Sequence, residues 1–243
     1  MYKRQGQEAL KLESVTKIFD PGEEQPLLNY RMTSDSLLLR SDSLILSEQY
    51  ADTDSSFQDL SAVKNVKWKN GTTLGKCGFF KFDQKDSLIV MIDNPILWSD
   101  STQLTADTII LYLENNEVYK ISLKSNAMIV TPDNNGMFNQ IKGAEIDNFI
   151  DDKELTRSHV MTNAELFYMI KEDDSYRGVN LTKSNEMIFT FDDDEISKID
   201  MDGQPTSNMQ EYTDGMDVTI YNLEGFKWRI KERPSEELFI AKK

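Results

Sequence analysis

Short polar runs recur along the chain, and hydrophobic residues alternate with polar ones on either side of each run. The runs begin at Asp52, Asp83, Glu114, Asp151 and Asp192 and read DTDS, DQKD, ENNE, DDKE and DDDE. Their starts are 31, 31, 37 and 41 residues apart. Alternation is typical of a strand with one buried face, and a recurring spacing of this size indicates a repeat architecture. The predicted unit is therefore strand, polar turn, strand.

A second turn signal follows each run, with its Asn or Gly 11 to 13 residues after the run begins. The signals read KNV at 64–66, DNP at 93–95, SNA at 125–127, TNA at 162–164 and DGQP at 202–205. Asn, Gly and Pro tolerate or impose sharp turns, and a strand resumes after most of these sites. Two corners per repeat favour a stack of V-shaped or flattened coils over a closed barrel. We therefore predict one elongated all-β domain of about five repeats.

The acidic runs raise the question of a metal site, because carboxylate oxygens are what Ca²⁺ prefers. The five runs share no ligand pattern, and lysine interrupts two of them. The glycine-rich nonapeptide of calcium-binding β-rolls is also missing, with only 11 Gly in the chain. We interpret the runs as solvated hairpin turns and predict no metal and no cofactor.

Charge and composition exclude several other functions. The net charge is −15 and there is no basic patch, which argues against nucleic acid as a partner. Cys77 and His159 are the only residues of their kinds, so disulfide frameworks, His-rich metal sites and Ser/His or Cys/His catalytic groups are hard to assemble. We expect Cys77 to be a partly buried thiol and His159 to face solvent. No catalytic residue is predicted, although carboxylate pairs in the turns leave a polysaccharide-acting enzyme as an alternative.

Two segments carry a family resemblance: LTADTIILYLENNEVYKISLKSNAMIV at 104–130 and IKGAEIDNFIDDKELTRSHVMTNAELFY at 141–168. They resemble the OstA/LptA-type repeats of lipopolysaccharide transport proteins, in which an L-x-A-D-like strand, a polar turn, a strand and a G-N-V-like corner recur. The likeness to longer OstA-like proteins extends through 93–109, FNQIKG at 138–143 and GFKWRIKERP at 225–234. It covers about 39–234, and leaves 1–38 as an unassigned arm or irregular repeat and 235–243 as a charged tail.

The resemblance implies a β-taco or β-jelly-roll, in which two antiparallel sheets fold against each other and stay open along one side. It implies non-enzymatic binding of lipopolysaccharide (lipid A) or another lipid, and its transport across the periplasm towards the outer membrane. The start of the chain lacks the apolar core of a secretory signal, so we expect the signal to be removed or the chain to be truncated. A structural or interaction module that pairs through open sheet edges is the second reading.

The inward-facing columns of the predicted strands are the candidates for a lipid groove, and a closed core is the alternative for each of them. The candidates are Phe80, Phe82, Ile109, Leu111, Leu113, Ile121, Leu123, Ile146, Val160, Met187, Phe189, Phe191, Ile199 and Met201.

The C-terminal segment 225–234 alternates Phe226, Trp228 and Ile230 and then reaches Pro234. We interpret it as a terminal strand that caps the stack. This segment also carries four positive charges in an acidic protein, on Lys227, Arg229, Lys231 and Arg233, and an open sheet edge can pair with another chain. The sequence therefore predicts head-to-tail self-association, or pairing with a homologous transport module, through the terminal strands. A monomer whose edge is covered by the first 35 residues or by the tail after Pro234 is the alternative.

Overall fold

The strands of the computed structural model form one antiparallel sheet. The structure describes residues 13–18, 28–31, 36–50, 56–133, 136–172, 175–192 and 195–240. The strands are β1 Glu13–Ile18, β2 Leu28–Arg31, β3 Ser36–Arg40, β4 Ser43–Tyr50, β5 Ser56–Asn70, β6 Thr73–Asp83, β7 Leu88–Ile92, β8 Ile96–Ser99, β9 Thr102–Thr105, β10 Thr108–Glu114, β11 Glu117–Pro132, β12 Phe138–Asp151, β13 Glu154–Glu172, β14 Ser175–Asp192, β15 Glu195–Asp202 and β16 Thr206–Glu211. Three short 3₁₀ turns follow, η2 Val218–Tyr221, η3 Ile230–Glu232 and η4 Glu236–Phe239. The all-β prediction is confirmed, and β1, β2 and part of β3 show that the segment 1–38 contributes strands to this sheet.

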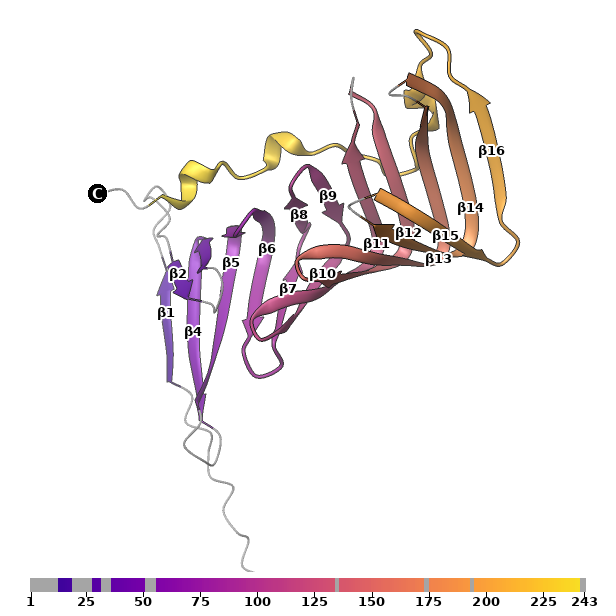
Figure 1. The fold of residues 1–243 in the computed structure, drawn as a ribbon. Helices are drawn as coiled ribbons and strands as arrows, with labels where there is room; N and C mark the ends of the chain where they lie inside the picture. The colour runs from indigo at the N-terminus through magenta and orange to yellow at the C-terminus, as the bar shows by residue number, and fades with distance from the viewer. Residues whose placement is uncertain are drawn as a thin grey trace, which may run out of the picture.

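The sheet is bent along its length into two arms. Arm A consists of 13–18, 43–63, 79–92, 108–124, 145–161 and 186–202, within the described residues. Arm B consists of 28–31, 36–40, 66–77, 96–105, 127–143, 164–184 and 206–211, again within the described residues. The bend is clearest at the C-terminal end, where β15 and β16 pair with different halves of β14 and point in different directions (Figure 1). This is the open stack of V-shaped coils that the two turn signals predict.

The bend is made by the predicted corners. Each corner contains two consecutive residues with positive φ: Lys64 and Asn65, Asp93 and Asn94, Ser125 and Asn126, Thr162 and Asn163, and Gly203 and Gln204. Asn and Asp occupy the left-handed region at lower cost than other non-glycine residues, which explains the recurring Asn. An aspartate from an earlier connection between strands stabilises two of these corners. Asp42, between β3 and β4, accepts from the side-chain amide of Asn65 at 2.8 Å, and Asp107, between β9 and β10, accepts from that of Asn126 at 2.9 Å.

The polar runs form the hairpins at the far edge of arm A. In the turns after β10 and β12 the two central residues have φ of 53° and 65° (Asn115 and Asn116) and of 47° and 71° (Asp152 and Lys153). Two consecutive positive φ values are typical of the type I′ turn, whose twist suits a hairpin. The run that begins at Asp83 also connects two strands, and Asp192 pairs with Glu195 across the next hairpin. The run at 52–55 lies outside the described residues.

The inner faces of the two arms enclose the main hydrophobic core. Eleven of the fourteen predicted groove residues are buried there: Phe80, Phe82, Ile109, Leu111, Leu113, Ile121, Leu123, Ile146, Val160, Met187 and Phe189. Phe191 and Ile199 are half-buried against the same core, and Met201 is 38% exposed. Strands pack their alternating residues here because each arm has one face turned to the other. The core opens towards the C-terminal end, where no further strand covers β15 within the described chain.

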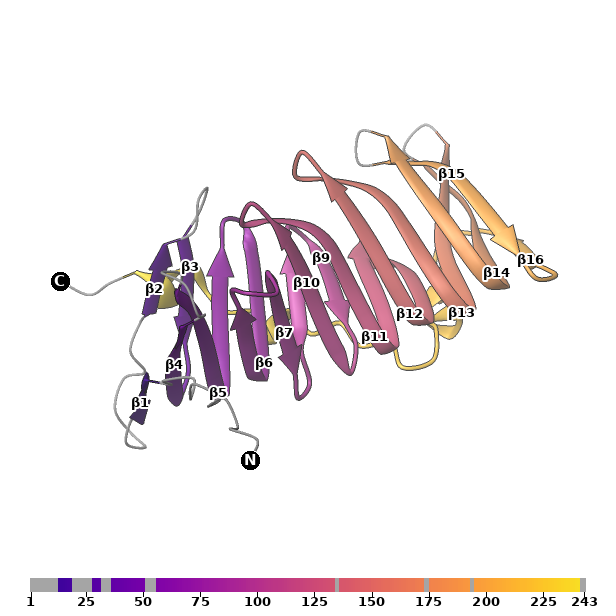
Figure 2. The ribbon, with the colours of Figure 1, turned by 90° about the horizontal axis from the view of Figure 1, so that it is seen from below.

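The prediction of a terminal strand at 225–234 is wrong. Residues 212–240, here called the strap, leave β16 and run back along the outer face of arm B as irregular chain and 3₁₀ turns (Figures 1 and 2). Phe226 and Trp228 pack against Phe138 with ring centroids 5.3 and 5.1 Å apart. Their alternation therefore reflects contact with a side-chain surface and involves no strand pairing.

The strap covers a second hydrophobic cluster on the outer face of arm B. Its buried members are Met128, Val130, Met137, Phe167, Met169, Val179 and Leu223. Arm B thus has apolar side chains on both faces, and exposure of the outer one to water would be unfavourable. The strap supplies the missing layer for arm B.

Two buried glutamines attach the backbone of the strap. Gln140 donates to the side-chain carbonyl of Asn222 at 2.6 Å and accepts from the N–H of Leu223 at 2.9 Å. Gln103 donates to the carbonyl of Lys227 at 2.8 Å and accepts from the N–H of Arg229 at 2.7 Å. Each glutamine side chain donates one hydrogen bond to the strap and accepts another from it, and the two strap residues are one or two positions apart. The two glutamines therefore set the register of the strap.

Candidate functional site

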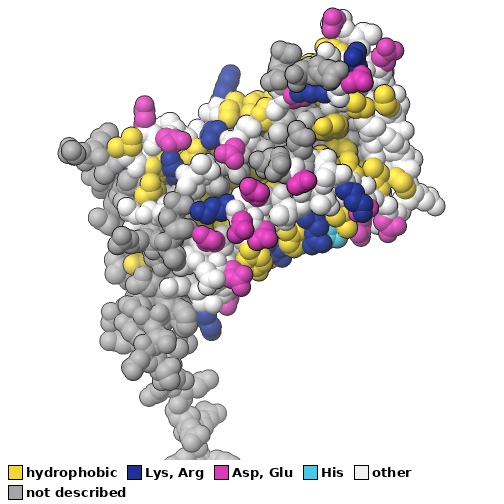
Figure 3. Space-filling model, in the orientation of Figure 1, with side chains coloured by type: hydrophobic (Ala, Val, Ile, Leu, Met, Phe, Trp, Pro, Cys, Tyr) yellow, Lys and Arg dark blue, Asp and Glu magenta, His cyan; other side chains and the backbone are white. Residues whose placement is uncertain are grey.

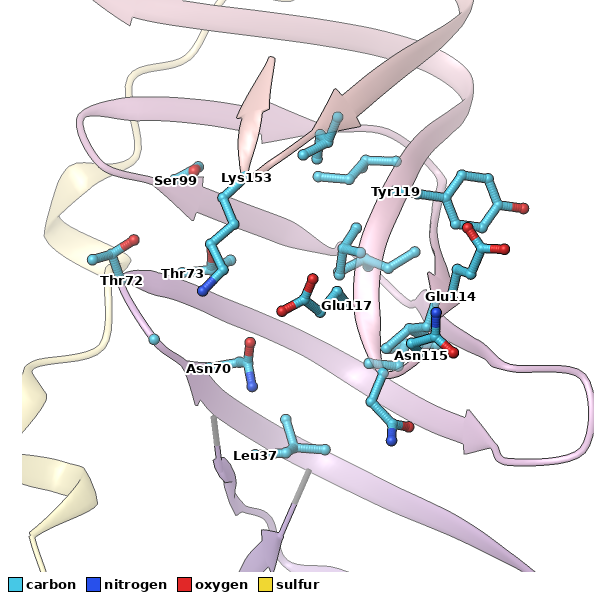
Figure 4. A pocket seen from close by; sticks show the side chains of 18 of the residues that line it. Leu37, Asn70, Thr72, Thr73, Ser99, Glu114, Asn115, Glu117, Tyr119 and Lys153 are labelled. Atoms are coloured by element: carbon cyan, nitrogen blue, oxygen red, sulfur yellow. The ribbon is translucent and has the colours of Figure 1, made fainter. Parts of the chain in front are cut away.

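A cavity of about 370 Å³ opens between the outer ends of the two arms. One wall comes from the tips of arm B, at the turns β5–β6 and β8–β9, and the other from the tips of arm A, at the turns β10–β11 and β12–β13. Figure 4 shows Asn70, Thr72, Thr73 and Ser99 on the arm B side and Glu114, Asn115 and Glu117 on the arm A side. The cavity is therefore the mouth of the folded sheet, at about its middle along the stack.

The base of the cavity is apolar. It is lined by Leu37, Trp68, Ile89, Leu111, Leu113, Val118, Ile121 and Ile150. These side chains come from arms A and B and belong to the main core or pack against it. Transfer of a hydrocarbon group from water onto such a surface is favourable.

The rim of the cavity is polar and mostly acidic. The charged residues among the described part of the lining are Asp100, Glu114, Glu117, Asp151 and Asp152 and one cation, Lys153. All five carboxylates belong to exposed residues at turn tips. In the space-filling view acidic side chains gather over the middle of the molecule (Figure 3). The cavity thus combines an apolar base with a charged entrance.

The predicted groove residues divide into two groups. Leu111, Leu113 and Ile121 line the cavity, whereas the other predicted residues do not. The buried members of the second group fill the space between the arms and pack with one another, as the closed-core alternative describes. The cavity is therefore confined to the outer part of the interior.

Five apolar lining residues are absent from the predicted set: Leu37, Trp68, Ile89, Val118 and Ile150. Ile89 continues the same alternation, so the sequence pattern could have identified it. Leu37 belongs to the unassigned segment. Trp68 is buried, and its indole N–H lacks a hydrogen-bond partner in the described part of the chain. This nitrogen packs over Gly75, where an added Cβ would lie 2.0 Å away.

Neither the cysteine nor the histidine lines this cavity. Cys77 is 4% exposed, and burial raises the pKa of its thiol to about 12, so it is not a thiolate nucleophile. His159 is half-buried on the outer face of arm A, with Nε2 3.2 Å from a carboxylate oxygen of Glu186. The expectation that His159 faces solvent is thus met only in part.

Among the described residues no group of three or more His, Cys, Asp or Glu side chains is placed to hold a metal ion.

The rim carboxylates, which the sequence places in turns, lie beside the cavity. Glu114 and Glu117 are nevertheless exposed at a turn tip. A carboxyl group that acts as a general acid in glycoside cleavage is usually held in an apolar environment that keeps it protonated. The rim offers no such environment to these two groups.

The fold and the cavity define a class: an open, two-armed antiparallel sheet with an apolar interior, which is the β-taco. Residues 29–117 match the model of the family described as LptA/(LptD N-terminal domain) LPS transport protein. This match confirms the resemblance of this part of the chain to the LptA/OstA-type lipopolysaccharide transport family.

One similar solved structure is LptH from Pseudomonas aeruginosa, described as the LptA homologous periplasmic component of the conserved lipopolysaccharide transport device. It is 15% identical, with a TM-score of 0.43, over 57% of this chain and 93% of that chain. No curated protein matches the sequence. Among the described residues, no helix has both the length and the apolar character that a membrane crossing requires.

Proposed function

We propose that this protein is a non-enzymatic lipid carrier that binds lipopolysaccharide through its acyl chains and passes it across the periplasm towards the outer membrane. The observation that carries the proposal is the cavity between the arms, with its apolar base and polar rim. The family match over 29–117 supports lipopolysaccharide as the cargo. An amphipathic ligand would place its hydrocarbon on Leu111, Leu113 and Ile121 and keep its head group at the mouth.

The size of the cavity fits part of one ligand. A volume of about 370 Å³ lies at the lower end of the range of small-molecule sites. Transfer of one methylene group from water contributes about 0.8 kcal/mol, so burial of about eight methylenes would contribute about 6 kcal/mol before the costs of binding. One acyl chain held in this way is enough for transient binding, which suits a carrier that must release its cargo.

The two ends of the stack support assembly with similar modules. At the C-terminal end β15 and β16 each pair only with β14 in the described sheet, and at the other end β1 pairs only with β4. Met201 in β15 and Met209 in β16 are 38% and 64% exposed. Unpaired strand edges with exposed apolar residues are templates for another strand, so pairing with a homologous module or a second copy would occur there and not through 225–234.

Photo-crosslinking from neighbouring positions of β10 tests lipid binding. Leu113 lines the cavity, whereas Tyr112 lies on the opposite face of the same strand and contacts Lys120. We expect p-benzoylphenylalanine at Leu113 to crosslink to lipopolysaccharide and the same group at Tyr112 to remain unlabelled. Equal labelling at both sites, or none at Leu113, would contradict the proposal, and circular dichroism of both variants would establish that the sheet is intact.

A further inference from the structure

Charge is distributed unevenly over the surface of the arms. On the outer faces many carboxylates lie beside lysines. Two pairs join neighbouring strands, Lys124–Glu145 at 2.6 Å and Lys183–Glu165 at 2.7 Å. Two others lie along one strand, Lys81–Asp83 at 2.7 Å and Lys198–Asp200 at 2.8 Å. Ion pairs of this kind neutralise charge locally.

The cavity mouth carries a local excess of negative charge. Among the described residues that line it, five carboxylates face one ammonium group, Lys153, a formal excess of four negative charges. None of the five forms an ion pair with another described residue. Four of them come from two adjacent hairpin tips of arm A, and Asp100 comes from arm B. The mouth is thus acidic on both sides, and the turn sequences ENNE and DDKE create this on arm A.

The head group of a bound acyl lipid would lie at this rim, because the apolar base takes the hydrocarbon. A phosphate monoester carries between one and two negative charges at neutral pH. At physiological salt, charges interact over about 8 Å. The carboxylates would repel each phosphate. Among the described residues, no three His, Cys, Asp or Glu side chains are placed together to hold a metal ion.

We propose that the cavity selects acyl lipids whose head group carries few or no phosphates, such as a dephosphorylated glycolipid. The selection rests on the proposed function, because it assumes that an acyl chain occupies the base. The acidic rim excludes the more highly charged forms, and the polar side chains of Thr72 and Thr73 offer neutral partners for sugar hydroxyls.

Competition binding with three synthetic lipid A molecules tests the selection. They share the same acyl chains and carry two phosphates, one or none, and each displaces a fluorescent acyl probe in the presence of a chelator. We expect the phosphate-free lipid to bind about tenfold more tightly than the bisphosphorylated one at low salt, and the difference to shrink at high salt. Carboxamide replacement at the rim, by Glu114→Gln, Glu117→Gln, Asp151→Asn and Asp152→Asn together, should remove the difference.

A matched control removes four negative charges from exposed sites away from the cavity. Asp202, Glu211, Asp214 and Glu237 are exposed and do not line the cavity, so their joint replacement by carboxamides should preserve the discrimination. Equal affinities in the unaltered protein, a preference for the bisphosphorylated lipid, or tight binding of that lipid only when Mg²⁺ is added would overturn the selection and leave lipid binding intact. Failure of all three lipids to bind would overturn the proposed function as well.

Discussion

The two buried glutamines provide a specific test of how the strap is held. In the variant Gln103→Ala with Gln140→Ala, four hydrogen bonds between arm B and the strap are lost. The N–H groups of Leu223 and Arg229 and the carbonyl of Lys227 also lose their partners. The apolar contacts of the strap and its ion pairs with Lys69 and Lys76 are left unchanged, so the variant isolates these four hydrogen bonds.

The magnitude follows from the number of lost bonds. A hydrogen bond contributes about 0.5–1.5 kcal/mol net, and a buried donor left without a partner costs about 1–3 kcal/mol. Gln140 is 0% exposed and Gln103 is 1% exposed, so water does not reach either site before the strap moves. We expect the docked strap to lose about 3–6 kcal/mol in the double variant. If detachment of the strap costs less than that, the strap will detach locally while the arms remain folded.

Hydrogen exchange measured by mass spectrometry distinguishes these outcomes. We expect amide exchange in 212–240 to rise by at least about a hundredfold, as a loss of about 3 kcal/mol requires, while exchange in β10 to β13 changes little. Gln84→Ala replaces an exposed glutamine in the β6–β7 turn and serves as the control. Unchanged exchange in the strap of the double variant would refute the assignment of these glutamines as its main polar attachments.

Four further outcomes are expected. Gly75→Ala should destabilise the protein by about 1–3 kcal/mol in urea unfolding, because its Cβ would lie 2.0 Å from the indole nitrogen of Trp68. Leu113→Trp should fill the cavity base and weaken lipid binding at least tenfold, by the competition assay, without loss of strand signal in circular dichroism. Because the folded pKa of Cys77 is about 12, above its unfolded value of 9.0, stability should be constant below ~pH 8.5 and fall by about 1.4 kcal/mol at ~pH 10, a loss absent from Cys77→Ala. Hydrogen bonds from arginine and lysine lower the pKa of Glu232 to about 2, so its contribution to strap protection should be present above pH 4.5, decline towards pH 2, and be missing in Glu232→Gln.

The strands and corners could be predicted because their signals are local. Alternation sets the inward face of a strand, and Asn65, Asn126 and Asn163 mark the positions where the backbone adopts positive φ. Lys64 and Ser125 stand where the family pattern has Gly, and both adopt positive φ at some energetic cost. The hydrogen bonds from the following Asn side chains to Asp42 and Asp107 offset this cost.

The strap could not be recognised from its own sequence. Alternation of Phe226 and Trp228 shows that one side of the segment is buried, but it does not distinguish a partner strand from a side-chain surface. The informative signal lies in arm B, where ILW at 96–98, AMIV at 127–130 and LFYMI at 166–170 are unbroken apolar runs. Such runs are typical of strands covered on both faces. They predict a covering layer without identifying which segment provides it.

The cavity was predicted only in its base. Leu111, Leu113 and Ile121 belong to the predicted inward columns, but the distance between the arms depends on how side chains of distant repeats fill the interior. The rim combines Asp100 with residues of two hairpins, and these residues come together because of the bend and the register of the sheet. Local sequence patterns predict neither the distance between the arms nor which turns meet at the rim.

Quenching of Trp68 by a lipid with brominated acyl chains tests the central claim most directly. Bromine quenches tryptophan on contact, and Trp68 lines the cavity whereas Trp228 packs on the outer face of arm B. In a protein with Trp98→Phe and Trp228→Phe, we predict strong quenching of the remaining Trp68 by the brominated lipid and none by its unbrominated counterpart. A protein that retains only Trp228 should be unaffected, and equal quenching of both proteins, or no quenching of Trp68, would contradict an acyl chain between the arms.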